Sequence, residues 1–163
     1  RGAMDDAGYA RLAAAMVNIG QGAGCAVLIE DDIDLAKRLG ADGVHVTGGP
    51  AALKAAIAAV KPAMIVGAGN LHSRHDAMTA GEVDIDYVFF GPTGGKPDAQ
   101  AEGLAEWWAQ TFEIPAVLSQ PDAGPDNADA RGAEFLALSQ NLWSAGSPAE
   151  AVRAIAATLG ASA

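Results

Sequence analysis

The chain has 163 residues, of which half are hydrophobic, and a formal net charge of -10. This size suits one globular domain over residues 1–163 with a sizeable core. The acidic charge argues against nucleic acid and anionic membranes as partners, because no basic stripe is present to replace counterions. No secretory leader is visible and no apolar run is long enough to span a bilayer, so we expect a cytoplasmic protein.

Short apolar runs alternate with helical patterns along the chain, after a first predicted helix over residues 7–21. The predicted strands are residues 25–29, 43–46, 64–67, 87–91, 116–119 and 135–139. The helices predicted after them are residues 33–39, 51–60, 73–80, 101–112, 127–131 and 149–159. Continuous apolar strands that alternate with helices predict an α/β fold with a parallel sheet and right-handed crossovers.

The first predicted strand begins at Cys25, the only cysteine, and ends in three acidic residues, Glu30, Asp31 and Asp32. We expect the thiol of Cys25 to be buried, and no internal disulfide can form. Ligands and metals bind at the carboxyl ends of strands in such folds, and carboxylates suit Mg²⁺. Asp32 is also a good N-cap for the helix that follows. Asp31, at the last strand position, is therefore the candidate metal ligand.

Two architectures can hold six strands of this kind. An open doubly wound sheet is one, but no glycine-rich dinucleotide fingerprint follows the first strand. A (β/α)8 barrel is the other, and it needs eight strands. Residues 1–4 look like the tail of a strand, so we expect the sequence to lack about one and a half βα units of a barrel at its N-terminal side.

Five blocks of residues, in this order, resemble thiamine-phosphate synthases and the closely related thiazole tautomerases. They are residues 28–36 (LIEDDIDLA), 40–46 (GADGVHV), 65–73 (IVGAGNLHS), 86–93 (DYVFFGPT) and 114–117 (IPAV). The resemblance covers essentially the whole chain. It implies a TIM barrel, of which this chain would hold about strands 3–8, and a place in thiamine biosynthesis.

The resemblance implies a synthase that joins an aminomethyl-pyrimidine diphosphate to a thiazole phosphate, with magnesium holding the diphosphate that is released. Such a reaction depends on charge stabilisation of the leaving group. The implied partners are small phosphorylated substrates, and a homo-oligomer is compatible with the sequence. Two other functions stay open. One is a thiazole-phosphate isomerase that uses His72 as acid or base, and the other is a non-catalytic family member that binds a ligand or a partner protein.

The metal and diphosphate contacts implied by the resemblance fall on few residues. Arg1 would hold the diphosphate bidentately. Asp31 matches the first metal-binding aspartate. The second falls near Pro50, whose side chain cannot coordinate a metal, so Glu30 or Asp32 would have to replace it.

The remaining site residues implied by the resemblance follow later strands. His72 can move protons near neutral pH. The turn after the fourth predicted strand could present backbone N–H groups and a lysine to a phosphate. The substrate-binding candidates are therefore Gly91, Thr93, Gly94, Gly95, Lys96 and Ser139, with Lys96 also a catalytic candidate. After the fifth predicted strand, Pro121 lacks an N–H donor, and the carboxylate of Asp122 would repel a phosphate.

Overall fold

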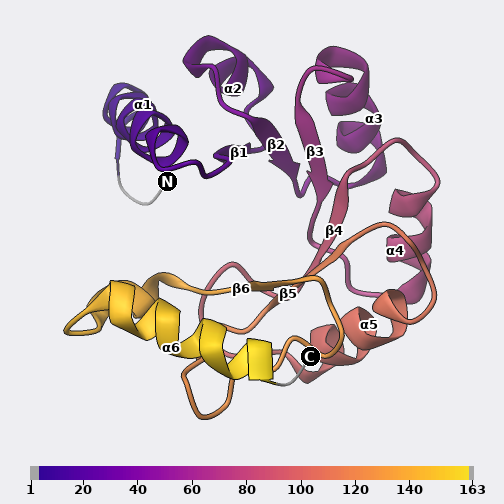
Figure 1. Ribbon diagram of the computed structural model, residues 1–163. Coiled ribbons are helices and arrows are strands. Elements are labelled where there is room, and N and C mark those ends of the chain that lie inside the picture. Colours follow the sequence, from indigo (N-terminus) through magenta and orange to yellow (C-terminus); the bar gives the residue numbers. More distant parts are fainter. Residues whose placement is uncertain (1–3, 162–163) are drawn as a thin grey trace. The chain divides into compact units, whose positions relative to one another are not determined.

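The computed structural model describes residues 4–161, which fall into two compact units (Figure 1). Unit 1 comprises Arg1–Gly69 and Val83–Asp86, and unit 2 comprises Asn70–Glu82 and Tyr87–Ala163, in each case within the described range. Each unit contains three parallel strands. Because one domain can contain two such units, the single domain predicted over residues 1–163 stays a prediction.

Unit 1 is a three-stranded parallel sheet with helices on one of its faces (Figure 1). Its elements are α1 (Asp6–Gly22), β1 (Leu28–Glu30), α2 (Ile33–Leu39), β2 (Gly43–Val46), α3 (Gly49–Val60) and β3 (Ile65–Ala68). In the central strand β2, Val44 is in register with Ile29 on one side and Val66 on the other. Val44 and Val66 are fully buried. Helix α2 packs on β1 and β2, and α3 packs on β2 and β3, which gives this sheet its apolar cover.

Local chemistry sets the ends of α2 at the residues predicted from the sequence. The Asp32 side chain accepts a hydrogen bond from the backbone N–H of Leu35, so Asp32 is the N-cap. Gly40 ends the helix in the left-handed region, with φ 65°. Asp32 and Gly40 together place α2 directly between the carboxyl end of β1 and the start of β2.

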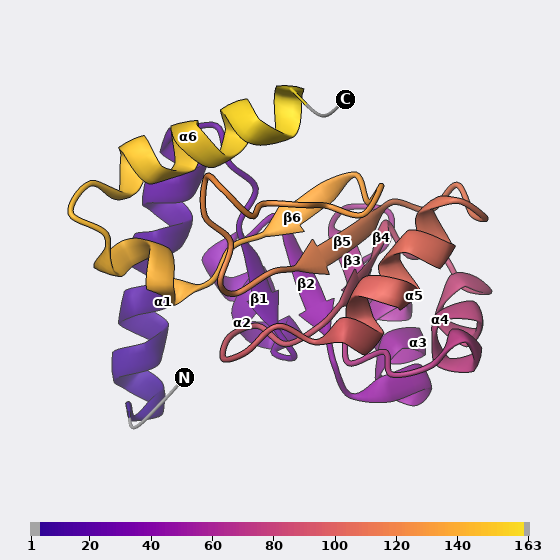
Figure 2. The same cartoon turned by 90° about the horizontal axis from the view of Figure 1, so that it is seen from below.

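Unit 2 contains the other three strands. Its elements are α4 (Arg74–Gly81), β4 (Tyr87–Phe90), α5 (Ala99–Ala109), β5 (Ala116–Ser119), β6 (Phe135–Ala137), the 3-10 helix η1 (Gln140–Ser144) and α6 (Pro148–Ala161). Strand β5 lies between β4 and β6, and α5 packs beside β4 and β5 (Figure 2). Trp108 of α5 is fully buried, stacks on Phe112 with ring centroids 4.2 Å apart, and donates its indole N–H to the Ile114 carbonyl. The core of unit 2 therefore forms around α5.

The predicted order of the six strands is confirmed, and so are the predicted helices except the one over residues 127–131, so the chain has an α/β fold with parallel strands. The closed eight-stranded cylinder stays a prediction. None of the helices within the described range has the length and apolar character that crossing a membrane requires.

Two details predicted from the sequence are wrong. The first strand begins at Leu28 and not at residue 25, and Cys25 is exposed. Residues 127–131 are turn and irregular structure and not a helix. The Asn127 side chain accepts a hydrogen bond from the backbone N–H of Gly124, and Arg131 has a φ of 53°, so turn chemistry replaces helix formation there.

Candidate functional site

Asp31 lies directly after β1 in unit 1 and is tied to the end of β2. Its Oδ1 accepts the backbone N–H of Thr47 at 2.7 Å, and its Oδ2 accepts the Thr47 hydroxyl. Its own N–H donates to the carbonyl of His45 at 2.9 Å. These bonds hold Asp31 in the left-handed region, with φ 52°, which is unusual for a residue other than glycine. The Asp31 carboxylate thus accepts hydrogen bonds from both the backbone N–H and the hydroxyl of Thr47.

His45 of β2 and Gly69, which follows β3, complement each other in shape. A Cβ atom on Gly69 would stand 2.4 Å from Nε2 of His45, so the imidazole fills the space that a side chain at position 69 would need. Burial lowers the pKa of His45, and the charges of Glu30 and Asp31 act in the opposite direction. The net lowering keeps the imidazole neutral at neutral pH.

The other acidic residues at this edge do not complete a magnesium site. Glu30 is exposed, and the carboxylate of Asp32 caps α2. Pro50 stands in the first turn of α3. In the part of the chain that the structure describes, no three His, Cys, Asp or Glu side chains are grouped so that they could hold a metal. The residues present therefore do not fit a magnesium ion held between two carboxylates.

His72 lines a cavity of about 220 Å³ in unit 2. The residues that line this cavity are Asn70, Leu71, His72, Gly91, Pro92, Asp98, Gln100, Ala101 and Leu104. Nε2 of His72 lies 2.8 Å from the side-chain oxygen of Asn70. Because a carbonyl oxygen only accepts, Nε2 is the donor in this bond, and in a neutral ring the lone pair is then on Nδ1. Asn70 reaches His72 from a left-handed backbone conformation with φ 58°.

Helix α5 fixes the backbone beside His72. Asp98 caps α5 by accepting the N–H of Gln100 at 2.9 Å. The Gln100 side chain then donates to the His72 carbonyl at 2.6 Å. On the other side of His72, Ser73 caps α4, and its hydroxyl lowers the pKa of Asp76 through a hydrogen bond. His72 therefore lies between two capped helix starts.

The loop after β4 carries five of the predicted substrate-binding residues. Gly91 lines the cavity, and a side chain there is disfavoured by its φ of 98° and by Ser119, whose Cβ would lie 3.2 Å from an added Cβ atom. Gly95 also has a positive φ, of 97°. Thr93 and Lys96 are exposed, and Gly94 is half-buried. The structure thus brings His72 and Gly91 to one cavity, with Lys96 five residues further along the loop.

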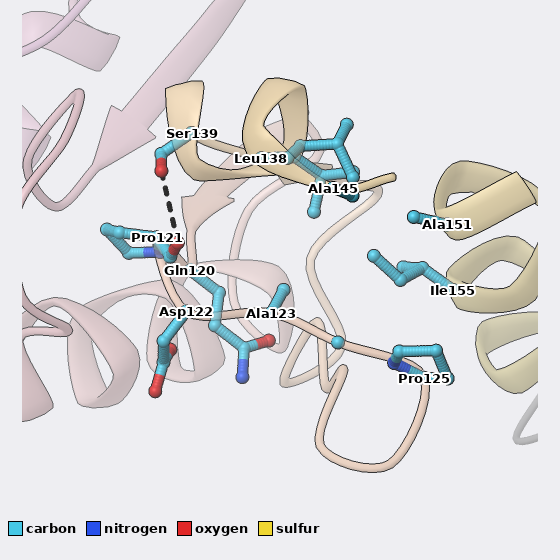
Figure 3. A pocket seen from close by; sticks show the side chains of 12 residues that line it. Gln120, Pro121, Asp122, Ala123, Pro125, Leu138, Ser139, Ala145, Ala151 and Ile155 are labelled. Atoms are coloured by element: carbon cyan, nitrogen blue, oxygen red, sulfur yellow. Dashed lines mark hydrogen bonds between the residues drawn. The ribbon is translucent and has the colours of Figure 1, made fainter. Parts of the chain in front are cut away.

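Ser139, which follows β6, is buried, and its hydroxyl donates to the carbonyl of Pro121 at 3.1 Å (Figure 3). The two residues border a second cavity of unit 2, of about 360 Å³, whose other walls include Leu138 and Ile155. Asp122 is the one charged residue among the described residues that line it. This cavity is therefore poorly suited to a phosphate group.

The residues predicted for the site are distributed over both units. Asp31 belongs to unit 1, whereas His72 and Lys96 belong to unit 2. Arg1 lies outside the described residues. Sequence reasoning missed Thr47, which directly follows β2 and so shares an edge with Asp31.

Sequence reasoning also missed two contacts of His72. Asn70 was visible as a polar residue two positions from His72. Nothing in the sequence pointed to Gln100, because its hydrogen bond to the His72 carbonyl depends on how α5 packs.

Comparisons with known proteins show which family the chain belongs to. The sequence model of the family described as thiamine monophosphate synthase matches residues 1–139. The thiamine-phosphate synthase of Hyphomonas neptunium is 39% identical, over 94% of this chain and 73% of the relative. That of Erythrobacter litoralis is 40% identical, over 93% and 75%.

A solved structure shows the same fold at low sequence identity. The thiamine phosphate pyrophosphorylase from Pyrococcus furiosus superposes with a TM-score of 0.78 at 18% identity, over 98% of this chain and 80% of that one. Together, the match over residues 1–139 and the two relatives show that this chain belongs to the thiamine monophosphate synthase family and has a synthase-type role in thiamine biosynthesis.

Proposed function

We propose that this chain itself catalyses the joining of an aminomethyl-pyrimidine diphosphate to a thiazole phosphate. The carbon–oxygen bond to the diphosphate breaks, the diphosphate leaves with the electron pair, and the thiazole nitrogen forms the new carbon–nitrogen bond. Family membership supports this transferase chemistry. The observation that carries the proposal is the 220 Å³ cavity at the carboxyl end of β4, bordered by His72 and Gly91.

The residues of unit 2 supply two kinds of group to this reaction. The loop from Gly91 to Lys96 offers backbone N–H groups and one ammonium to the leaving diphosphate, which stabilises charge where it develops. His72, with its Nε2 proton engaged by Asn70, offers the lone pair of Nδ1 to a donor group of a substrate. No step in this scheme needs a protein nucleophile.

The synthase is favoured over the other two functions considered from the sequence. The relatives from Hyphomonas neptunium and Erythrobacter litoralis are both thiamine-phosphate synthases and match more than nine-tenths of this chain. Neither likeness supports the thiazole-phosphate isomerase or the non-catalytic binding protein.

Turnover is the direct test. The full-length protein is incubated with the pyrimidine diphosphate and the thiazole phosphate in magnesium-containing buffer, and thiamine phosphate is measured. We expect product well above the uncatalysed mixture, and a loss of about 100-fold in kcat/KM for Lys96→Ala. Lys54→Ala is the matched control, because Lys54 is an exposed lysine of α3, and its activity should be unchanged. Absence of product, or equal losses in the two variants, would overturn the proposal.

We further infer that the strands belong to a (β/α)8 barrel. The parallel strands that alternate with helices and the likeness to the Pyrococcus furiosus protein support this inference. An experimental structure of the full-length protein tests it, and an open sheet would contradict it.

A further inference from the structure

The carboxyl ends of β1 and β2 hold a carboxylate that is already satisfied by the protein. Both oxygens of Asp31 accept hydrogen bonds, and both donors come from Thr47. One of the donors is a backbone N–H, which does not move away without displacing the chain after β2. The backbone N–H of Asp31 adds a third bond between these strand ends, through the His45 carbonyl. Asp31 and Thr47 thus form one closed hydrogen-bonded unit, which we name the Asp31–Thr47 clasp.

The Asp31–Thr47 clasp occupies part of the Asp31 carboxylate. Mg²⁺ demands near-octahedral oxygen ligands at about 2.0–2.1 Å and loses its water reluctantly. Thr47 uses two of the roughly four lone-pair positions of the Asp31 carboxylate, one on each oxygen. The other positions stay open to a cation, but one carboxylate can fill at most two corners of an octahedron of ligands.

The neighbouring residues supply few of the further oxygen ligands that a magnesium ion needs. Asp32 is committed to the N-terminus of α2, where its Oδ1 accepts the Leu35 N–H at 2.9 Å. Pro50, in the first turn of α3, offers no side-chain oxygen. Of the three acidic residues 30–32, only Glu30 remains, and it is exposed at the end of β1.

We propose that Thr47 replaces a divalent cation as the partner of Asp31, so that this chain has no resident magnesium site at the ends of β1 and β2. Asp31 is then a positioning residue that joins the two strand ends. The inference does not depend on turnover, because it concerns ion binding to the protein alone. It departs from the two-aspartate magnesium site that the family resemblance implied.

The test uses Mn²⁺ as a paramagnetic substitute for Mg²⁺. The full chain is titrated with Mn²⁺ and the free ion is followed by electron paramagnetic resonance, first without and then with inorganic diphosphate. We expect the wild type and Asp31→Asn to give the same binding curve in both conditions. The double variant Thr47→Gly, Pro50→Asp should gain a site at least about tenfold tighter than any in the wild type. Adding Asp31→Asn to that double variant should remove the new site.

Two controls keep the comparison clear. Thr47→Ser retains both donors to Asp31 and should bind Mn²⁺ like the wild type. Pro50→Asp places an acidic residue in the first turn of α3, where the helix dipole favours it, so the variant should fold. Wild-type Mn²⁺ binding that Asp31→Asn abolishes would overturn the proposal, and a double variant that gains no site would overturn the role given to Thr47.

Discussion

At the scale of single residues, His45 and Gly69 act as a complementary pair. The imidazole takes the space above Gly69, with only 2.4 Å between Nε2 and an added Cβ atom. We expect Gly69→Ala to lower the free energy of unfolding by about 1–3 kcal/mol, because the ring has to move out of a packed position. Urea unfolding measures the change.

A double-mutant cycle between positions 45 and 69 can distinguish this steric clash from a general effect of replacing a glycine. His45→Ala should make Gly69→Ala nearly harmless, which gives a large interaction energy in a double-mutant cycle. Gly103→Ala in α5 is the contrasting control, because an added Cβ atom there meets nothing within 4 Å and helix propensity should raise stability. Additive losses at Gly69 and His45 would contradict the steric explanation.

His45 also gives stability a defined pH dependence. Burial holds its pKa below the usual 6.5, so the unfolded chain takes up a proton at a higher pH than the folded one. The free energy of unfolding should therefore fall as the pH drops below the unfolded value, until the folded imidazole is protonated too. Urea midpoints at about pH 7.5 and 5.5 should separate more for the wild type than for His45→Gln. An equal separation in the two proteins would show that another group dominates this range.

At the scale of elements, one device recurs before each even-numbered strand. Asp42 precedes β2 and accepts the backbone N–H of Val27, and Asp86 precedes β4 and accepts that of Val66. Glu134 precedes β6 and accepts that of Ala116. In each case an acidic side chain accepts a backbone N–H within one residue of the start of the preceding strand. The pairs Asp42–Val27 and Asp86–Val66 belong to unit 1, and the pair Glu134–Ala116 belongs to unit 2.

We expect Glu134→Ala to lower stability by about 1 kcal/mol, because it leaves the N–H of the buried Ala116 without its acceptor. Glu134→Gln keeps an acceptor oxygen and should lose less. Glu113→Ala, at an exposed loop position before β5, is the control for removing one negative charge. Guanidinium unfolding of the three variants checks the order, and equal losses for the Glu134 and Glu113 variants to Ala would contradict the proposed contact.

The ends of the strands show where reasoning from the sequence succeeded and where it did not. The runs 43–46 and 116–119 match β2 and β5 at both ends, because their apolar residues coincide with the paired ones. The first run extended to Cys25, but the N–H of Val27 bonds to the Asp42 side chain and strand pairing starts at Leu28. Hydropathy cannot reveal that a side chain 15 positions away takes this donor.

In the candidate site, too, the sequence predicted the positions of residues along the chain but not the contacts that form when distant segments pack together. The rule that ligand groups gather at the carboxyl ends of parallel strands placed Asp31 and Gly91 correctly at strand ends. The partner of Asp31 was not predicted, because Thr47 reaches it only after β1 and β2 pair. The tie between Gln100 and His72 depends in the same way on the packing of α5.

At the scale of the whole molecule, the chain carries a net charge of -10, whereas the proposed substrates are anionic. The long-range field of the protein repels a diphosphate, whereas Lys96 attracts it only at short range. Screening extends over about 30 Å at 0.01 M salt and about 8 Å at 0.15 M, so added salt weakens the long-range repulsion first. We therefore expect kcat/KM for the pyrimidine diphosphate to rise over this range of salt, which steady-state kinetics with a non-coordinating salt can measure.

Charge variants decide whether the net charge causes this rise. Asp34→Asn, Asp84→Asn and Glu106→Gln remove three exposed negative charges outside the residues that line the His72 cavity. Their combined variant should capture the diphosphate faster at low salt and respond less to added salt. Removing Lys96 should lower kcat/KM at every salt concentration without flattening the rise, because its attraction acts at contact. A wild-type kcat/KM that falls steadily with salt would mean that a local positive field outweighs the net charge and guides the substrate to the site.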